Sequence, residues 1–370
     1  MNILIIGGTG VISSDVCKKA INNGDNVYML NRAKRKDKMS LKSHLIVGDI
    51  KKESVEEITN KLCGYTFDVV VDFLSYNVKQ LKKTVECTPC KQYIFVSSAT
   101  VYEKQSDSHI YCENDPKGNR GWDYCSDKYD CELELEKLAR EKRFHFTIVR
   151  PYVTYNETRF PYQISPVEYY TIVDRIKRGR PIPICGNKQT TVTDAGDFAI
   201  GMIGLFMNPK AFDQAFHITT DKTTTWRRIA ELLANCYGKK CTFVDVPEKD
   251  LENISNTIID ISEILLDKGR VMKFNNDKIK NAVPNFSAER EIDESIQNIF
   301  NYFETGKNLK INYLWAGCMD RLMKKYMKNS AGQYNFNNMK ERVMYIVGYS
   351  NCLCSIYLFV RRVKCKFKGE

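Results

Sequence analysis

A tyrosine and a lysine four residues apart, Tyr124 and Lys128, are the side chains in this sequence best suited to proton transfer. On a helix, this spacing places both side chains on one face. A free phenol has a pKa of about 10, and a nearby ammonium group favours its phenolate form. The pair therefore predicts a general acid or base. Ser98 follows the apolar run 93–97, at the strand end where parallel sheets bind ligands, and is a candidate to hold a substrate hydroxyl.

A glycine-rich turn separates the apolar run 2–6 from a helical pattern over 11–23. A dinucleotide pyrophosphate needs close backbone approach and the positive end of a helix, which this order of strand, turn and helix supplies. A plain tight turn is the alternative. The third glycine of the common fingerprint is replaced by Ser13. The predicted cofactor contacts in this region are Gly7, Gly8, Thr9, Gly10, Val11 and Ile12.

The residues after the second predicted strand bear on the choice between NAD and NADP. Sites for NAD usually carry an acidic residue there, which binds the ribose hydroxyl. This chain has Asn31 and Arg32, at the start of the cationic run 31–36. A guanidinium matches a 2′-phosphate, so we expect NADP rather than NAD, with a solvated charged loop as the alternative. Asp49 and Ile50 follow the next strand, and we expect them beside the adenine.

These candidates need a framework of alternating strands and helices. Apolar β-branched runs predict strands at 2–6, 26–30, 45–47, 69–73, 93–97 and 146–149. Helical patterns lie between them at 11–23, 54–62, 78–86 and 126–142, the last with Leu133, Leu135 and Leu138 near its buried side. This alternation predicts an α/β fold, a Rossmann-type doubly wound parallel sheet. We expect a dinucleotide-binding domain over 1–155 and a smaller mixed substrate domain over 156–305, from which the chain can return to the first.

The composition narrows the class of protein. The chain has 370 residues, of which 43% are hydrophobic, and this excludes a disordered polymer. The net charge is +11, but residues 307–370 hold 13 Lys/Arg and 3 Asp/Glu, which leaves +1 for residues 1–306. We therefore expect no nucleic acid on the main fold. Its 14 unevenly spaced cysteines predict reduced thiols in a cytoplasmic protein. Cys87 and Cys90 lack a second ligand pair, so no metal site is predicted.

The basic extension over 306–370 contains a strongly apolar segment at 343–360. Arg361, Arg362 and Lys364 follow this segment directly. An apolar run with a positive flank is typical of a short membrane-spanning or interfacial helix, so association of this tail with a membrane is one interpretation. A packed terminal helix or a dimer contact is the other.

Three motifs, in this order, resemble the extended short-chain dehydrogenase/reductases of the NAD-dependent epimerase/dehydratase family. They are Gly-Gly-Thr-Gly at 7–10, Ser-Ser-Ala-Thr-Val-Tyr at 97–102 and Tyr-x-x-x-Lys at 124–128. The resemblance covers residues 1–305 and implies a nucleotide-sugar substrate. It also implies that Tyr124 is the catalytic acid/base and that Lys128 lowers its pKa and binds the nicotinamide ribose. Ser98 would hold the substrate hydroxyl, and the family would pair as a homodimer through the helix at 126–142.

In such an epimerase, the sugar is oxidised to a 4-keto intermediate and then reduced from the other face. A dehydratase of the family needs an acid pair after the hydroxyl residue, where this chain has Ala99 and Thr100. We therefore rank epimerisation or carbonyl reduction above dehydration. The alternative is a catalytically weak protein that senses dinucleotide or binds RNA on the same fold, because stem-loop-binding proteins of chloroplasts resemble this family.

Overall fold

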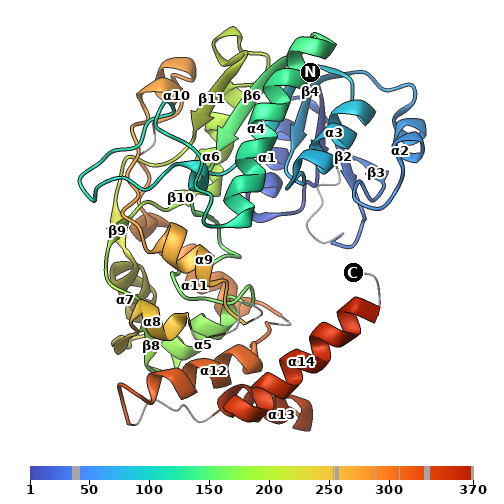
Figure 1. Cartoon of the computed structure of the whole chain (residues 1–370). Helices are drawn as coiled ribbons and strands as arrows, with labels where there is room; N and C mark the ends of the chain where they lie inside the picture. Colours follow the sequence, from blue (N-terminus) through green and yellow to red (C-terminus); the bar gives the residue numbers. More distant parts are fainter. Residues whose placement is uncertain are drawn as a thin grey trace. The chain divides into compact units, whose positions relative to one another are not determined.

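The computed structural model describes residues 1–35, 42–252, 254, 258–287, 289–307, 309–328 and 334–367. The chain forms two compact units (Figure 1). The first comprises Met1–Asn156, Thr191–Thr223 and Met272–Ile292, and the second comprises Glu157–Thr190, Thr224–Val271 and Asp293–Glu370. The sequence assigns 191–223 and 272–292 to the second domain and allows the chain to return to the first; both segments belong to the first unit. Residues 306–370 fall in the second unit instead of forming a separate extension.

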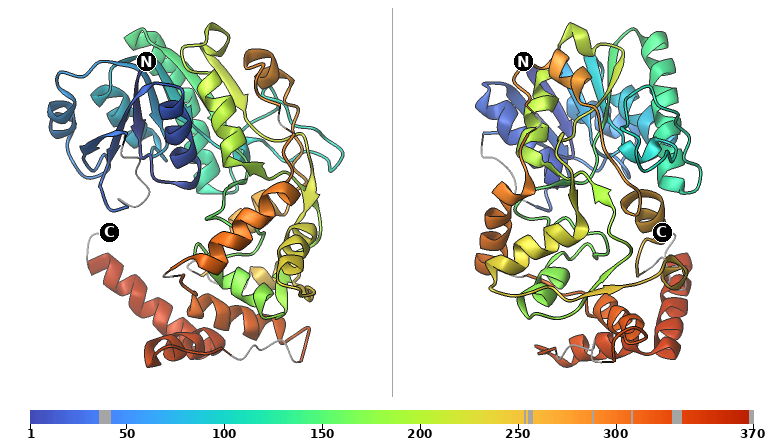
Figure 2. Two further views of the ribbon diagram at one scale, coloured as in Figure 1. Left: turned by 180° about the vertical axis from the view of Figure 1, so that it is seen from behind. Right: turned by 90° about the vertical axis from the view of Figure 1, so that its left-hand side faces the viewer.

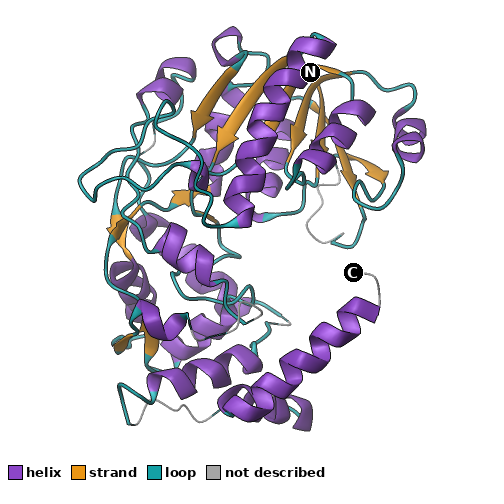
Figure 3. Ribbon diagram, viewed as in Figure 1, coloured by secondary structure: helices purple, strands orange, loops and turns teal. Residues whose placement is uncertain are grey.

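The first unit is built on the large sheet drawn in orange in Figure 3. It has seven strands in the order β3-β2-β1-β4-β5-β6-β11. Every neighbouring pair is parallel, which confirms the predicted α/β class. The strand order reverses between β1 and β4, and ligands of doubly wound sheets bind at such a switch point. The strands are β1 (Asn2–Ile6), β2 (Asn26–Asn31), β3 (His44–Val47), β4 (Phe67–Asp72), β5 (Cys90–Val96), β6 (His145–Arg150) and β11 (Gln214–His217).

Helices cover both faces of this sheet (Figure 2). Successive side chains of a strand point to opposite faces, so Ile3 and Ile5 join one buried cluster while Leu4 and Ile6 join the other. The first cluster includes α1 (Val11–Asn22), α6 (Ala195–Gly204) and α10 (Asp277–Ala282). The second includes α2 (Val55–Leu62), α3 (Val78–Cys87) and α4 (Asp123–Lys142). The continuous apolar run 2–6 is therefore explained by burial on both sides.

The helix that carries the predicted proton-transfer pair begins earlier than the sequence pattern indicates. The predicted start is Ser126, whereas α4 begins at Asp123, so Tyr124 and Lys128 both lie within it. Leu135 and Leu138 are buried as predicted, but Leu133 is 49% exposed. The remaining elements of this unit are η2 (Ala99–Val101), β7 (Thr154–Tyr155), β10 (Thr193–Asp194) and η3 (Pro209–Ala211).

The second unit is mainly helical. Its helices are α5 (Tyr170–Lys177), α7 (Trp226–Cys236), α8 (Glu248–Leu251), α9 (Ile261–Glu263), the π-helix η4 (Ile264–Lys268), α11 (Ile292–Thr305), α12 (Tyr313–Met323), α13 (Met339–Tyr349) and α14 (Asn351–Phe367). Short strands pair as β8 (Ile182–Ile184) with β13 (Phe243–Asp245) and as β9 (Gln189–Thr190) with β12 (Thr224–Thr225). A fully buried ion pair, Arg175 with Asp320 at 2.7 Å, joins α5 to α12 and thereby anchors the terminal helices.

The apolar segment 343–360 is divided between α13 and α14. Ser350 has an extended backbone between the two helices, and its side-chain oxygen accepts a hydrogen bond from the backbone of Leu353 at 3.4 Å. The helices meet at a bend of 108°. Within the described residues, no one helix combines the length and apolar character needed to cross a membrane, although this bent pair meets both criteria when taken together.

Candidate functional site

The glycine turn leads directly from β1 to the start of α1. Gly7 and Gly8 have φ values of 114° and 82°, which favour glycine. A Cβ atom on Gly8 would lie 2.7 Å from the sulfur of Met29, so any side chain would crowd the turn. Ser13, in the place of the third glycine, accepts a hydrogen bond from the backbone of Gly10 at 2.9 Å and so stabilises the turn. The turn ends at the start of α1, where the free backbone N–H groups of a helix carry partial positive charge.

The ends of β2 and β3 hold the other predicted dinucleotide contacts. Asn31 accepts a hydrogen bond from the backbone of Ala33 at 2.8 Å, while its buried amide nitrogen has no partner among the described residues. Arg32 is exposed beside it, and Lys36 of the same run lies outside the described residues. Asp49 accepts a hydrogen bond from the backbone of Lys51 at 3.2 Å. Ile50 is buried.

These positions fit a dinucleotide. The turn, Asn31 and Asp49 follow the carboxyl ends of β1, β2 and β3, three adjacent strands of one parallel sheet. Gly7 and Gly8 have a backbone conformation that favours glycine, and the unpaired amide of Asn31 is a buried donor in need of an acceptor. The turn, Asn31 and Asp49 therefore lie at the carboxyl edge of the sheet, where doubly wound folds bind ligands.

Lys128 is buried at the carboxyl end of β5, with 2% of its surface exposed. Its ammonium group donates hydrogen bonds to the carbonyl oxygens of Ser75 and Val96, both at 2.8 Å. It also lies 4.8 Å from the centre of the Tyr76 ring. Burial lowers the pKa of Lys128 to about 8, because removal from water disfavours the charged form. Nearby Asp72 opposes this shift.

Asp72, at the end of β4, positions the loop that contacts Lys128. Its carboxylate is fully buried and accepts hydrogen bonds from the backbone of Leu74 and Ser75 at 2.8 and 3.0 Å. The Tyr93 hydroxyl donates to the same carboxylate at 2.7 Å. The carboxylate thus fixes the Ser75 carbonyl that Lys128 uses. In the sequence, Asp72 is only a residue at the end of a predicted strand. Its role in positioning the loop becomes clear from its complete burial in the structure.

Tyr124 lies in the first turn of α4 among other aromatic rings. Its ring centre is 6.2 Å from that of Tyr76 and 5.0 Å from that of Trp122. Since Tyr76 also contacts the Lys128 ammonium, one aromatic ring links the two members of the predicted pair. The structure therefore brings Tyr124 and Lys128 to one location, as their spacing predicts.

Ser98 lies two residues beyond Val96, whose carbonyl contacts Lys128. It precedes η2, and its oxygen accepts hydrogen bonds from the backbone and hydroxyl of Thr100 at 3.3 and 2.9 Å. Because the oxygen only accepts in these bonds, the Ser98 proton is left for another acceptor. The adjacent Ser97 hydroxyl is buried and has no partner within the described part of the chain. Two hydroxyl groups are therefore available at this strand end.

A buried ion pair that sequence reasoning missed attaches α4 to β6. Arg150 forms two hydrogen bonds to Glu132, at 2.9 and 2.7 Å, and both side chains are almost fully buried. Arg150 also donates to the Tyr102 hydroxyl at 3.1 Å. Glu132 lies one helical turn after Lys128, so this pair fixes the helix that carries the predicted catalytic residues. This ion pair is recognised only from the structure, in which residues 132 and 150 lie side by side.

His217, which belongs to the first unit, is part of the same network. It is fully buried at the end of β11, and its ring nitrogen Nδ1 lies 3.3 Å from the Tyr102 hydroxyl. Its backbone donates to Glu113 at 3.2 Å, and its other ring nitrogen contacts the carbonyl oxygen of Asn275. Burial lowers the pKa of His217. Both ring nitrogens of His217 therefore contact protein groups, and the histidine is part of the core.

The cysteine pair at 87 and 90 shows no metal-binding geometry. The Cys87 thiol contacts the carbonyl oxygen of Val55 at 3.7 Å, and burial raises the pKa of Cys90 to about 12. A search of the described residues finds no group of three or more His, Cys, Asp or Glu side chains placed to hold a metal ion.

Sequence comparison gives one family match and one curated relative. The model of the NAD dependent epimerase/dehydratase family matches residues 3–218. The chain is 28% identical over 251 residues to the chloroplast stem-loop binding protein of 41 kDa b from Arabidopsis thaliana. That alignment covers 64% of this chain and 63% of the relative, so the chain spans somewhat less than two thirds of the relative's length.

Solved structures similar to this chain include several epimerases. An epimerase from Methanothermobacter thermautotrophicus has a TM-score of 0.67 at 15% identity and covers 82% of this chain and 92% of its own. A UDP-glucuronic acid 4-epimerase from Bacillus cereus, solved with NAD, has a TM-score of 0.65 at 14% identity and covers 82% and 99%. A UDP-glucose 4-epimerase from Thermotoga maritima has a TM-score of 0.64 at 20% identity, with the same coverage. At these identities the likeness establishes the fold.

Proposed function

The chain belongs to the NAD dependent epimerase/dehydratase family, and we propose that it is an enzyme that epimerises or reduces a nucleotide-activated sugar with NAD or NADP. The observation that carries this proposal is the environment of Lys128. A buried ammonium held by two carbonyl oxygens, next to the ring that contacts Tyr124, is costly to maintain. Such a group is expected where its charge serves chemistry.

The residues at the ends of β1, β2 and β3 would hold the cofactor. The backbone of the turn 7–10 and the start of α1 would bind the pyrophosphate. The unpaired amide of Asn31 and the exposed guanidinium of Arg32 would face the adenosine ribose, where a guanidinium favours a 2′-phosphate. Asp49 and Ile50 would flank the adenine. When bound, the nicotinamide accepts and returns a hydride.

The proton is handled by the residues of α4 and β5. Tyr124 would remove the proton from a sugar hydroxyl during oxidation and return it during reduction. The Lys128 ammonium, while charged, stabilises negative charge on that phenol. Ser98, whose oxygen already accepts two hydrogen bonds from Thr100, would donate its own proton to the same sugar oxygen. Ser98 would therefore orient the substrate, and Tyr124 would transfer the proton.

Epimerisation or carbonyl reduction is favoured over dehydration by the residues after Ser98. A dehydratase must eliminate water, which requires an acid and a base beside the sugar. Ala99 carries no functional group, and the hydroxyl of Thr100 is engaged with Ser98. The helical second unit, by resemblance to the family, is the part that would bind the nucleotide sugar.

Substitution of Tyr124 by phenylalanine tests the proposal. Tyr124→Phe should lower kcat by about 10²–10⁴-fold while cofactor affinity stays within a few-fold, because the phenol acts on the proton. Tyr76→Phe is the matched control, since its ring lies beside Tyr124 but carries no assigned proton. The measurement is steady-state turnover on a panel of UDP-sugars, with NAD(H) and NADP(H) binding followed by fluorescence. Unchanged turnover in Tyr124→Phe would refute its assignment as acid/base.

The cofactor preference is tested at Arg32. Arg32→Ala should weaken NADPH by about tenfold or more and leave NADH nearly unchanged, because the guanidinium forms a charge-assisted contact with the 2′-phosphate alone. Lys34→Ala, an exposed cation in the same loop, is the control. Equal losses for both cofactors would mean that Arg32 does not read the 2′-phosphate.

A second candidate function is RNA binding or dinucleotide sensing on the same fold. The observation that favours it is the similarity to the chloroplast stem-loop binding protein. The first measurement is to unfold the purified protein and identify any released nucleotide by mass spectrometry. Retained NAD would favour a self-recycling epimerase, and retained NADP would favour a reductase. If no dinucleotide is released and neither binds when added, while a labelled RNA stem-loop does bind, the second candidate replaces the first.

A further inference from the structure

The two terminal helices expose apolar side chains in regular stripes. On α13 these are Met339, Val343 and Ile346, which are 70%, 47% and 46% exposed. Their spacing of four and three residues places them on one face of the helix. On α14 the stripe consists of Leu353, Ile356, Phe359 and Val360, which are between 43% and 68% exposed. These seven side chains are named the terminal apolar surface. Exposed large apolar side chains along one face of a helix are typical of an interaction site.

The opposite sides of both helices are occupied by protein. A Cβ atom on Gly348 would lie 2.1 Å from the carbonyl oxygen of Leu314, so α13 and α12 pack with their backbones in close contact. On α14, Cys354 and Leu358 are only 3% and 8% exposed. Each helix therefore has one face packed on its own unit and one apolar face left over. A partner can reach the helices from the outer side only, which suits a helix that lies flat on a surface.

The charge around this surface is mainly positive, because Glu341 is the one acidic side chain among the described residues of α13 and α14. Lys340 and Arg342 flank the stripe of α13, and Arg361 follows the stripe of α14. From residue 342 to residue 369 the sequence contains no Asp or Glu, while Lys and Arg recur after 360. A second copy of this chain would bring two such basic segments together, and their repulsion would oppose pairing. An anionic lipid surface complements them.

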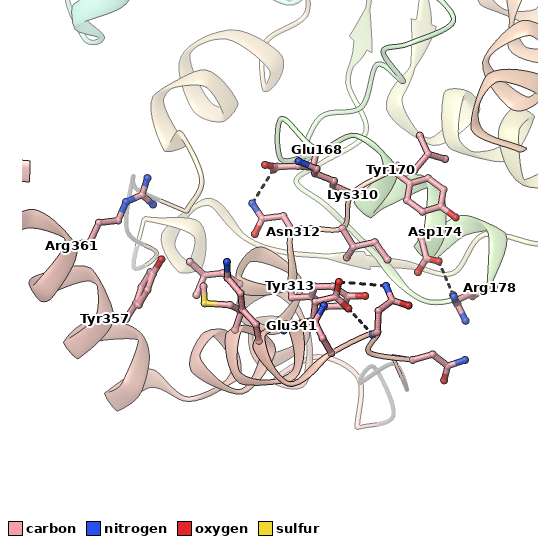
Figure 4. A pocket seen from close by; sticks show the side chains of 18 residues that line it. Glu168, Tyr170, Asp174, Arg178, Lys310, Asn312, Tyr313, Glu341, Tyr357 and Arg361 are labelled. Carbon is pink, nitrogen blue, oxygen red and sulfur yellow. Dashed lines mark hydrogen bonds and ion pairs between the residues drawn. The ribbon is translucent and has the colours of Figure 1, made fainter. Parts of the chain in front are cut away.

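Charged side chains of both signs line a hollow beside these helices (Figure 4). The hollow measures about 700 Å³. Its cations are Arg178, Lys310, Lys340 and Arg361, and its acids are Glu168, Asp174 and Glu341. Arg361 and Tyr357 of α14 lie on one side of it, and Lys310 and Tyr313 lie on the other (Figure 4). Arg178 is paired with Asp174 at 2.7 Å, whereas Lys310, Lys340 and Arg361 form no ion pair within the part of the chain that the structure describes. They are thus available to a phosphate group.

We propose that α13 and α14 attach this protein to the surface of an anionic bilayer. The terminal apolar surface enters the boundary between head groups and acyl chains, and the flanking Lys and Arg side chains contact lipid phosphates. Lys310, Lys340 and Arg361 around the hollow receive one such head group. The helices lie in the plane of the membrane, because their inner faces remain packed on the second unit.

Vesicle sedimentation with the full-length protein tests this attachment. We expect it to pellet with vesicles of phosphatidylcholine and phosphatidylserine, and to pellet far less with phosphatidylcholine alone. Binding should weaken as salt rises, because screening reduces the attraction between lysine or arginine and lipid. The double variant Ile356→Asp, Phe359→Asp should lower the partition coefficient by at least about tenfold, since both side chains are largely exposed and leave the fold intact.

Two further variants make the result specific. Ile110→Asp is the matched control, since Ile110 is 55% exposed, like Ile356, but lies in the first unit. It should bind vesicles as the unaltered protein does. Lys310→Ala with Arg361→Ala should reduce the preference for phosphatidylserine. The proposal is overturned if the protein pellets with neither vesicle, or if the double variant binds as well as the control. It is also overturned if size-exclusion chromatography without lipid shows a dimer that the double variant abolishes, because a second copy would then cover this surface.

Discussion

The buried ammonium of Lys128 leads to a quantitative prediction about stability. Burial lowers its pKa to about 8 from the ordinary value of 10.5. Between these values the unfolded chain binds more protons than the folded chain, so stability rises with pH across this window. A difference of about 2.5 pKa units at ~1.36 kcal/mol per unit amounts to about 3 kcal/mol. Below pH 8 the charged side chain therefore costs about 3 kcal/mol relative to its neutral form at high pH.

The variant Lys128→Met removes this titration. Its loss of two hydrogen bonds to Ser75 and Val96 shifts stability by an amount that depends little on pH. The difference in unfolding free energy between the unaltered protein and the variant should thus change by about 3 kcal/mol from below pH 8 to pH 10.5, in favour of the unaltered protein. Urea unfolding followed by circular dichroism at several pH values measures it. Lys137→Met, an exposed lysine on the same helix, is the control.

A difference that stays constant with pH would show that the ammonium is not desolvated, and the reasoning from burial would fail. If the predicted change appears, the fold carries a destabilising charge beside Tyr124 at neutral pH. If Lys128→Met then loses activity without a comparable loss of stability near pH 7, the free-energy cost of the buried ammonium is retained because the charge is needed for activity.

Two further substitutions probe the framework of the site. Glu132→Ala should lower the free energy of unfolding in urea by about 3–5 kcal/mol, because Arg150 is left charged and unpaired in the interior. Asp130→Ala, which removes an exposed ion pair, should lower it by less than about 1 kcal/mol. Similar losses for the two variants would contradict this reasoning. Gly8→Ala should cost about 1–3 kcal/mol and weaken dinucleotide binding, because positive φ and a methionine sulfur at 2.7 Å both oppose a side chain. Gly24→Ala has a similar φ of 85° and open space, so its stability cost should be smaller and cofactor binding, measured by titration, should be unchanged.

Local patterns were sufficient to predict the first half of the chain. The apolar run 2–6, the glycine turn and the helix that follows form a contiguous unit, so adjacent residues specify it. The spacing of Tyr124 and Lys128 likewise determined that the two side chains share a helix face. The strand ends that hold Asn31, Asp49 and Ser98 follow from the rule that parallel strands end at one edge.

Contacts between residues far apart in the chain could not be predicted from the sequence. Arg150 and Glu132 are 18 residues apart in the chain, and His217 joins the sheet beside a strand that ends at Arg150. No local pattern marks any of these residues as one that pairs with a distant partner. Segments 191–223 and 272–292 belong to the first unit because of the surface on which each buries its apolar face. The spacing of apolar residues shows that such a face exists but not which surface covers it. The division of 343–360 depends on Ser350, an ordinary residue whose capping role appears only once the backbone turns.

The sequence by itself determined the class of fold, the glycine turn between β1 and α1 and the pair on α4, because each is encoded by residues close together in the chain. Only the tertiary structure decided how deeply Lys128 is buried, which carbonyl oxygens hold it and which faces of α13 and α14 remain uncovered. Burial depends on every segment that packs around a residue, so no single stretch of sequence contains it. The pKa of Lys128 and the terminal apolar surface are therefore properties of the folded chain.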